Sequence, residues 1–218
     1  MLELLTAAIT AAAVAAAACV VPSDVVPAPV VAQEERRIVP VESLVLAFYW
    51  WPQECRRGNN AGSSGCRASF GLQVHGLWPD GAGSTDPQFC RAPTELSIAE
   101  VRRTWCLTPS PGLMQHEWAK HGTCHWPDAA SYFGEMRRVA ATITLPDLDR
   151  GPVASAGGVR DAVVAANPAV PRDGIFVGTD RNQWLTEVRI CLDLGDRPRS
   201  CSAGAGAGDA ATVRVWPR

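Results

Sequence analysis

The stretch that decides the fold runs from residue 69 to residue 79 and reads SFGLQVHGLWP. Apolar side chains alternate with glycine and glutamine over Phe70–Val74, the period of two that is typical of a β-strand with one buried face. We therefore predict a strand over Ser69–His75. His75 falls on the face opposite Val74, so we expect its imidazole to point away from the apolar face of the strand.

The flanking sequence supplies further strands and helices. Ser43–Trp51 (SLVLAFYWW) is an apolar, aromatic run closed by Pro52, which predicts a buried strand. Trp184–Leu192 (WLTEVRICL) predicts another strand, and Val213–Trp216 predicts a final short one. Capping residues and helical spacing predict four helices, over Ser97–Trp105, Pro111–His121, Asp128–Ile143 and Val159–Ala166. Because strands and helices do not alternate regularly, we expect an α+β fold with a central, mainly antiparallel β-sheet flanked by helices.

The composition suits one globular domain. The chain has 218 residues, of which 47% are hydrophobic and 19% charged, which excludes a disordered or fibrous protein. Lys and Arg number 20 against 22 Asp and Glu, and no block of basic residues occurs, so no broad electrostatic footprint for nucleic acid is present. Lys120 is the only lysine in the sequence, and a lysine supplies a compact point charge that arginine does not.

The N-terminal region predicts export. Leu4–Val21 carries no charge and is mostly alanine, which favours a secretory signal over a membrane span. We expect residues 1–32 to form a signal peptide and a Pro/Val-rich linker, and residues 40–218 to form a single domain. The mature protein is then secreted or periplasmic, monomeric and without a stable membrane span. Lipid anchoring at Cys19, which follows a run of alanines, is the alternative.

Eight cysteines are best explained by the same expectation of export. An oxidising compartment turns them into a disulfide framework. Cys55 and Cys66 flank a polar segment rich in Gly and Asn, a short loop that one disulfide could close. If Cys19 is removed with the signal, seven cysteines remain, so we expect one to be free or paired outside the chain.

Three of the four histidines fall in two short motifs, HGLWP at 75–79 and HEWAKHGTC at 116–124. On a helix that turns by about 100° per residue, Glu117, Lys120 and His121 lie within roughly 100° of one another. His116 widens this arc to roughly 140°. One helix face thus presents an acid, an ammonium and two imidazoles, which are costly to bury for structure alone.

A zinc site is the first chemical interpretation of this face. Zinc-binding helices carry HExxH, but here the spacing is HExxxH and Lys120 stands where the second ligand belongs. We therefore expect no metal and no other cofactor. Two imidazoles can instead act as general base and general acid, beside an ammonium that stabilises a developing oxyanion. Cleavage of RNA by its own 2′-hydroxyl needs this set and no metal.

Both motifs resemble the active-site segments of a known family. FGLQVHGLWP and HEWAKHGTC are similar to the two catalytic segments of the ribonuclease T2 family, in the same order and with matching separation. LAFYWWPQEC resembles the family's first strand, and EVRICLD with Cys201 resembles its closing strand and disulfide. The resemblance covers about residues 43–202 and is weakest over 128–180. It implies a ribonuclease T2-like, disulfide-stabilised fold and a metal-independent endoribonuclease. Such an enzyme cleaves single-stranded RNA through a 2′,3′-cyclic phosphate to 3′-phosphate ends, with low base specificity.

The resemblance also implies roles for the motif residues. His75 and His121 form the acid–base pair, with His121 as the base toward the 2′-hydroxyl and His75 as the acid. Glu117 and Lys120 stabilise the transition state, and His116 helps to hold the phosphate. Because His121 lies near a helix C-terminus and close to Glu117, we expect its pKa to be raised, which suits an acidic optimum.

Two further residues have alternative interpretations. Trp78 resembles the family's base-stacking aromatic, and packing in the core is the alternative. Asp80 matches a position that contacts a base in some members, and a turn-forming role before Gly81 is the alternative.

The last implication of the resemblance concerns the disulfides. It pairs Cys55 with Cys66, Cys90 with Cys124, and Cys191 with Cys201, and it leaves Cys106 without a partner. Two rival interpretations of the whole chain remain, a secreted binding or toxin-like module on a T2-like fold and a small zinc hydrolase. The intact motif residues argue against the first rival, and the spacing of the histidines argues against the second.

Overall fold

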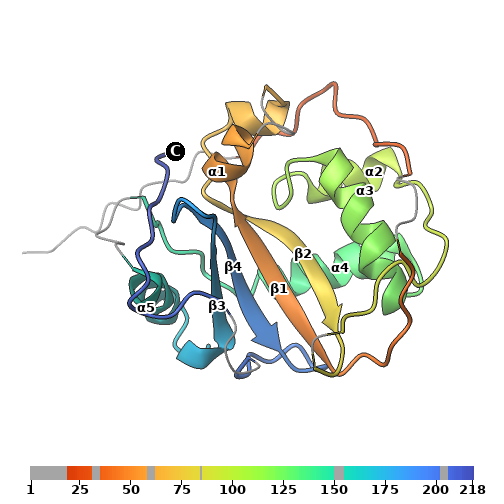
Figure 1. Cartoon of the computed structure of the whole chain (residues 1–218). Coiled ribbons are helices and arrows are strands. Elements are labelled where there is room, and N and C mark those ends of the chain that lie inside the picture. Colours follow the sequence, from red (N-terminus) through yellow and green to blue (C-terminus); the bar gives the residue numbers. More distant parts are fainter. Residues whose placement is uncertain (1–18, 31–34, 58–61, 84, 150–154, 202–205) are drawn as a thin grey trace, which may run out of the picture.

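The computed structural model describes residues 19–30, 35–57, 62–83, 85–149, 155–201 and 206–218 (Figure 1). A four-stranded antiparallel sheet with the strand order β2-β1-β4-β3 forms the centre of the molecule. Its strands are β1 (Ser43–Trp50), β2 (Leu72–Asp80), β3 (Ile175–Thr179) and β4 (Leu185–Leu192). Helices lie beside this sheet, so the predicted α+β class is confirmed.

Five α-helices and three short 3₁₀ turns complete the described part of the chain. The α-helices are α1 (Trp51–Arg56), α2 (Ile98–Thr104), α3 (Pro111–Lys120), α4 (Ala129–Ala140) and α5 (Ala156–Ala166). The 3₁₀ turns are η1 (Ser64–Arg67), η2 (Gly122–Cys124) and η3 (Arg172–Gly174). Helices α2 to α5 each begin at a Ser or Asp whose side chain accepts a backbone N–H three residues later. Such caps satisfy amide groups that the first helical turn leaves unbonded.

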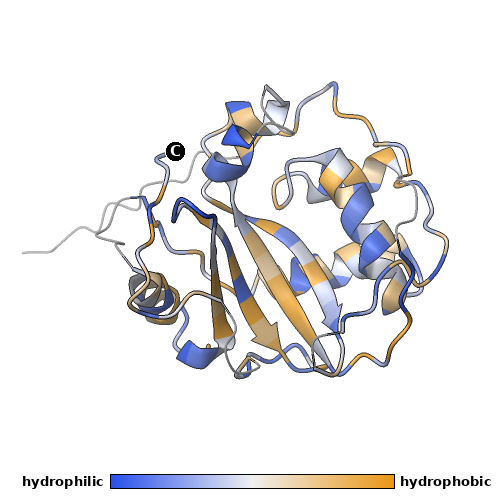
Figure 2. Cartoon of the chain, viewed as in Figure 1, coloured by the Kyte–Doolittle hydropathy of each residue, from blue (hydrophilic) through white to orange (hydrophobic). Residues whose placement is uncertain are grey.

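The two faces of the sheet differ in burial. Alternate residues of β1, from Leu44 to Trp50, are completely buried, and the apolar colour in Figure 2 follows most of β1 and the C-terminal half of β4. Helix α4 contacts β1 and β2, helix α5 contacts β3, and their apolar residues belong to one core with the strands. Full burial of a side chain such as Phe48 stabilises the fold by about 1.5–3 kcal/mol. The opposite face carries Tyr49, which is only half-buried.

A β-bulge in β2 places His75. Ala47 of β1 pairs with Gly76, but Phe48 pairs with Val74, so His75 is an extra residue with no partner across the ladder. Bulges of this kind turn a side chain away from the regular alternation and are common beside active sites.

Several predicted boundaries need correction. Trp51 does not continue the first strand but begins α1, with Pro52 in its first turn, where the missing N–H costs no hydrogen bond. The second strand begins at Leu72 rather than Ser69 and continues beyond His75 to Asp80.

The C-terminal part departs further from prediction. Val213–Trp216 is not a strand of the sheet, because Arg214 makes only an isolated parallel bridge to Trp184. Ile175–Thr179 forms the edge strand β3, which the sequence analysis did not predict. This strand is five residues long and includes Gly178, so its pattern is too short to stand out.

The three disulfides that the resemblance implies are present, and a fourth joins Cys19 to Cys106. No cysteine in the described part of the chain is free, so the expectation of an unpaired cysteine, with Cys106 left over, is wrong. Val25 is buried, and Arg102 donates to the Pro22 carbonyl at 3.2 Å. The segment that starts at Cys19 therefore packs on the domain.

The predicted signal segment up to residue 18 lies outside the described residues. Within the described ranges, no helix is long and apolar enough to cross a membrane.

Candidate active site

The end of helix α3 lies against strand β2 and brings the two motifs together. Cys124, just after α3, is bonded to Cys90, and the Phe89 amide donates to the Lys120 carbonyl at 2.8 Å. Gly122 follows the helix where a Cβ atom would lie 2.4 Å from the Trp118 ring, so only glycine fits there. These contacts hold the C-terminal turn of α3 beside the bulge of β2.

His75 is held between two carboxylates. Its Nδ1 lies 2.6 Å from Glu187 Oε1, and its Nε2 lies 3.2 Å from Glu117 Oε1. The ring stacks on Tyr49 with the centroids 3.6 Å apart. Burial alone would lower the pKa of His75, but Glu117 and Glu187 outweigh burial and raise it to about 9. His75 is therefore an imidazolium at neutral pH.

Glu117 is a buried anion at the centre of the cluster. Its Oε2 accepts a hydrogen bond of 2.6 Å from Trp78 Nε1. Burial would raise the pKa of Glu117, but His75 and then the other motif histidines lower it to about 2. Gly76 makes this approach possible, because a Cβ there would lie 2.3 Å from Glu117 Oε2 and 2.5 Å from Trp78 Nε1.

Trp78 lies among the catalytic candidates rather than in the apolar core. Its ring stacks on His121 at 5.0 Å and meets His75 edge-on at 4.7 Å. The Arg189 guanidinium lies 4.8 Å from the centre of the same ring system. The half-buried indole thus contacts both histidines of the expected acid–base pair and, through Nε1, the carboxylate of Glu117.

His121 has the opposite electrostatic environment to His75. Burial lowers its pKa, Glu117 raises it, and the charges of Lys120, His75 and His116 lower it again, to about 4. Our expectation of a raised pKa at His121 is therefore wrong, because burial, together with the positive charge around the ring, outweighs the effect of Glu117. Its Nδ1 is buried without a hydrogen-bond partner among the described residues.

The remaining predicted site residues lie at different distances from this cluster. His116 and Lys120 are half-buried on α3, and the His116 ring meets Phe89 edge-on at 6.2 Å. Asp80 lies at the far end of β2, where it accepts a hydrogen bond of 2.9 Å from the Ser43 hydroxyl. Burial and the neighbouring Asp86 raise the pKa of Asp80. Asp80 thus lies five residues beyond His75 and two residues beyond Trp78 on the same strand.

Three residues of the site were not identified from the sequence. They are Tyr49 on β1 and the pair Glu187 and Arg189 on β4. Arg189 Nε donates to Glu187 Oε2 at 2.6 Å, and the guanidinium also lies 4.4 Å from the centre of the Phe176 ring. The available signal was two opposite charges at positions i and i+2 in an otherwise apolar strand, which places both on one face.

No group of three or more His, Cys, Asp or Glu side chains in the described ranges is arranged as a set of metal ligands.

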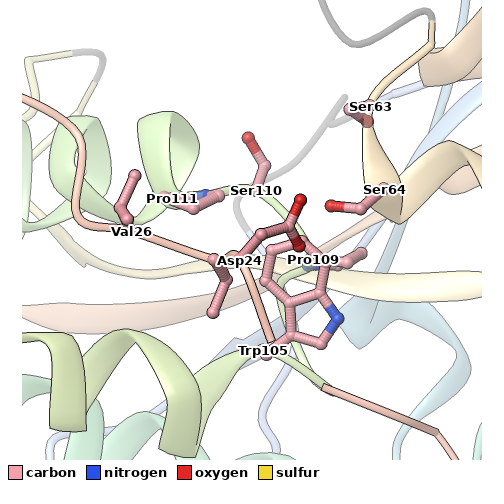
Figure 3. A pocket seen from close by; sticks show the side chains of 9 residues that line it. Asp24, Val26, Ser63, Ser64, Trp105, Pro109, Ser110 and Pro111 are labelled. Atoms are coloured by element: carbon pink, nitrogen blue, oxygen red, sulfur yellow. The ribbon is translucent and has the colours of Figure 1, made fainter. Parts of the chain in front are cut away.

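A separate cavity lies at the other end of α3 (Figure 3). Its volume is about 200 Å³, and Asp24 of the N-terminal segment, Trp105 and Ser110 are among its lining residues. Ser110 caps the N-terminus of α3, whereas His121 ends the helix, so the cavity is distinct from the histidine cluster.

Residues 41–148 match the model of the ribonuclease T2 family. The chain is similar to a probable ribonuclease of Haemophilus influenzae, with 31% identity over 50% of this chain and 45% of that protein. The aligned region thus spans about half the length of that relative. It is also similar to ribonuclease T2 of Sus scrofa, with 29% identity over 59% of this chain and 75% of that protein.

Solved structures share the fold. An RNase-related protein from Calystegia sepium superposes with a TM-score of 0.61 at 20% identity, over 79% of this chain and 96% of that one. A mutant of RNase MC1 in complex with 5′-UMP gives a TM-score of 0.59 at 22% identity, over 75% of this chain and 94% of that one. The family model and the matching ribonucleases show that the chain belongs to the ribonuclease T2 family.

Proposed function

We propose that this protein cleaves single-stranded RNA by transphosphorylation, with His121 as the general base and His75 as the general acid. The observation that carries the proposal is the opposite shift of two neighbouring imidazoles. The pKa of His75 is raised to about 9 and that of His121 is lowered to about 4. At neutral pH one ring then carries a proton to give, and the other can accept one, as an acid–base pair requires.

In the proposed first step, His121 takes the proton of the 2′-hydroxyl. The 2′-oxygen attacks phosphorus, the bond to the 5′-oxygen breaks, and His75 Nε2 protonates the departing oxygen. The products are a 2′,3′-cyclic phosphate and a free 5′-hydroxyl. In the second step water attacks the cyclic phosphate with the roles reversed, which leaves a 3′-phosphate.

The other groups of the cluster stabilise charges that the reaction requires. The Lys120 ammonium, with His116, stabilises the negative charge that develops on the pentacoordinate phosphorus. Glu117 holds His75 as a cation. The contact between His75 Nε2 and Glu117 is longer, at 3.2 Å, than the 2.6 Å contact of Nδ1 with Glu187. We therefore assign Nε2, which is held less tightly than Nδ1, as the nitrogen that donates its proton to the substrate.

Base recognition is also part of the proposal. Stacking on an aromatic ring tolerates every base, which fits low base specificity. Trp78 is the proposed stacking residue, although its contacts with Glu117 and His121 also support a positioning role. If Asp80 contacts a base, its carboxylate must accept that contact in addition to the hydrogen bond from Ser43.

We propose that the protein acts outside the cytoplasm, secreted or in the periplasm. Four disulfides support an oxidising compartment. The small residues Ala16 and Ala18 suit a signal peptidase, and cleavage after Ala18 leaves Cys19 free to bond with Cys106. The disulfide occupies the Cys19 sulfur, to which a lipid anchor would be attached, so it argues against lipid anchoring.

Digestion of a defined RNA by the purified, oxidised protein in excess EDTA tests this function. We expect 2′,3′-cyclic phosphate ends by mass spectrometry, abolished in His75→Ala and in His121→Ala. Cleavage that EDTA blocks would contradict the metal-free mechanism. No cleavage by the folded protein would favour the binding-module alternative. Light scattering on the same sample tests the expected monomer.

A further inference from the structure

Glu187 lies between His75 and Arg189 on the face of the sheet that carries Tyr49. One carboxylate oxygen lies 2.6 Å from His75 Nδ1, and the other accepts a 2.6 Å hydrogen bond from Arg189 Nε. The Glu187 side chain is only 8% exposed. It belongs to neither histidine motif and is 112 residues from His75 in the sequence.

We propose that Glu187 is a positioning residue for the acid–base reaction: it binds His75 Nδ1 and fixes the imidazolium so that Nε2 points at the departing oxygen. This inference rests on the proposed function and extends it to a residue on another strand. A carboxylate on the remote nitrogen of a catalytic histidine sets both the orientation and the tautomer of the ring.

The geometry around His75 requires such a partner. His75 is the bulged residue of β2, so no residue of β1 stands opposite it to fix its side chain. Stacking on Tyr49, with 22° between the planes, defines the plane of the ring but not its rotation within that plane. Two carboxylates restrain that rotation, and the 2.6 Å contact of Nδ1 with Glu187 is shorter than the 3.2 Å contact of Nε2 with Glu117.

Arg189 in turn fixes Glu187. Its guanidinium lies 4.8 Å from the centre of the Trp78 ring and 4.4 Å from that of Phe176, which restrains it between two strands. A buried carboxylate is stable as an anion when cations bond it, and here each oxygen of Glu187 has one.

The charge balance at His75 gives the inference a measurable consequence. The groups that face His75 are Tyr49 on β1, Glu117 and His121 at the end of α3, and Glu187 and Arg189 on β4. Only Glu117 and Glu187 oppose the effect of burial on the pKa of His75. Removal of the Glu187 charge leaves one carboxylate, so His75 should lose its proton at a lower pH.

Glu187→Gln removes this charge and keeps the shape of the side chain. We would measure kcat and KM on a dinucleotide RNA from pH 4 to 10, and titrate His75 by NMR. We expect kcat to fall about 10- to 100-fold with KM within about threefold. We also expect the alkaline limb of kcat and the NMR pKa of His75 to fall by at least about one pH unit.

Glu100→Gln is the matched control. Glu100 is as buried as Glu187, at 7% exposed, and pairs with Arg137 outside the histidine cluster. Its loss should lower the melting temperature without moving the pH profile. Arg189→Gln keeps the Glu187 charge but removes the hydrogen bond that orients its carboxylate. We expect kcat to fall by less than in Glu187→Gln, with no fall in the pKa of His75, because a nearby cation has been removed. If Glu187→Gln does not fold, wild-type kcat in Arg189→Gln overturns the inference.

A folded Glu187→Gln protein with wild-type kcat and an unchanged alkaline limb overturns the inference. If the wild type itself does not cleave RNA, the proposed function fails instead. The NMR titration then decides alone: a lower pKa of His75 in Glu187→Gln supports the Glu187 contact, and an unchanged pKa overturns it.

Discussion

The indole nitrogen of Trp78 donates a 2.6 Å hydrogen bond to Glu117, which ties the strand that carries His75 to the helix that ends at His121. Because Glu117 also contacts His75, this bond adds to the contacts that hold the proposed acid near the proposed base. Trp78 therefore has a positioning role in the proposed chemistry, in addition to any stacking on a base.

Trp78→Phe keeps an aromatic ring but removes the donor to Glu117. A buried carboxylate oxygen then lacks its hydrogen bond, which should lower the free energy of unfolding by about 1–3 kcal/mol. We expect kcat to fall by about tenfold, since one tenth of the rate corresponds to about 1.4 kcal/mol in the barrier. Steady-state kinetics measures the change in kcat, and urea unfolding measures the change in the free energy of unfolding. Trp184→Phe, in a ring stack with Trp216, is the control and should keep kcat. Equal kcat in the two variants would contradict the role of Trp78.

Gly76→Ala should disrupt the same contact sterically. The added Cβ would lie 2.3 Å from Glu117 Oε2, which no real Cβ tolerates, so Glu117 or the strand must move. We expect a loss of more than about tenfold in kcat, because displacements of about 1 Å at a catalytic group are costly. Gly112→Ala in α3 meets no atom within 4 Å and should keep activity while it stabilises the helix. The account fails here if Gly76→Ala is fully active.

Stability should depend on pH on the alkaline side. The pKa of His75 in the folded protein is about 9, above its ordinary value of 6.5, so its stabilising effect is complete below about pH 6.5. That effect is lost as the pH rises through 9, and it amounts to a few kcal/mol. Urea unfolding at pH 6 and at pH 9.5 measures the loss. His75→Gln should flatten this dependence; the same alkaline loss in both proteins would assign it to another group.

The Cys19–Cys106 disulfide should stabilise the exported protein without affecting catalysis. It spans 87 residues and, on the chain-entropy model, contributes about 4.6 kcal/mol to the free energy of unfolding. Cys106→Ser should therefore unfold at a clearly lower temperature and keep kcat. The intact mass of the exported protein should correspond to residues 19–218 with four disulfides. A mass that begins later in the sequence, or one that includes a lipid, would contradict the proposed processing.

The sequence was most informative where one motif supplies both structure and chemistry. The alternation before His75 and the capped helix before His121 placed both histidines correctly on a strand and at a helix end. The sign of the pKa shift of His121 could not be derived, since it depends on burial and on cations that only the folded chain brings together.

Other features depend on pairing between distant segments. The contact of Glu187 with His75 exists because β1 lies between β2 and β4, and no local pattern encodes that strand order. The bulge at His75 likewise appears only in the register with β1. Cys19 was assigned to the signal because it ends an alanine run, whereas its partner Cys106 lies 87 residues away.

The most direct test of the account is an NMR titration of the histidine ring protons in the wild-type protein, with assignments from His75→Gln and His121→Gln. We predict that His121 titrates near pH 4 and His75 near pH 9, so that His75 is protonated and His121 is neutral at neutral pH. The reverse order, or two rings that both titrate near 6.5, would contradict the assignment of His121 as base and His75 as acid.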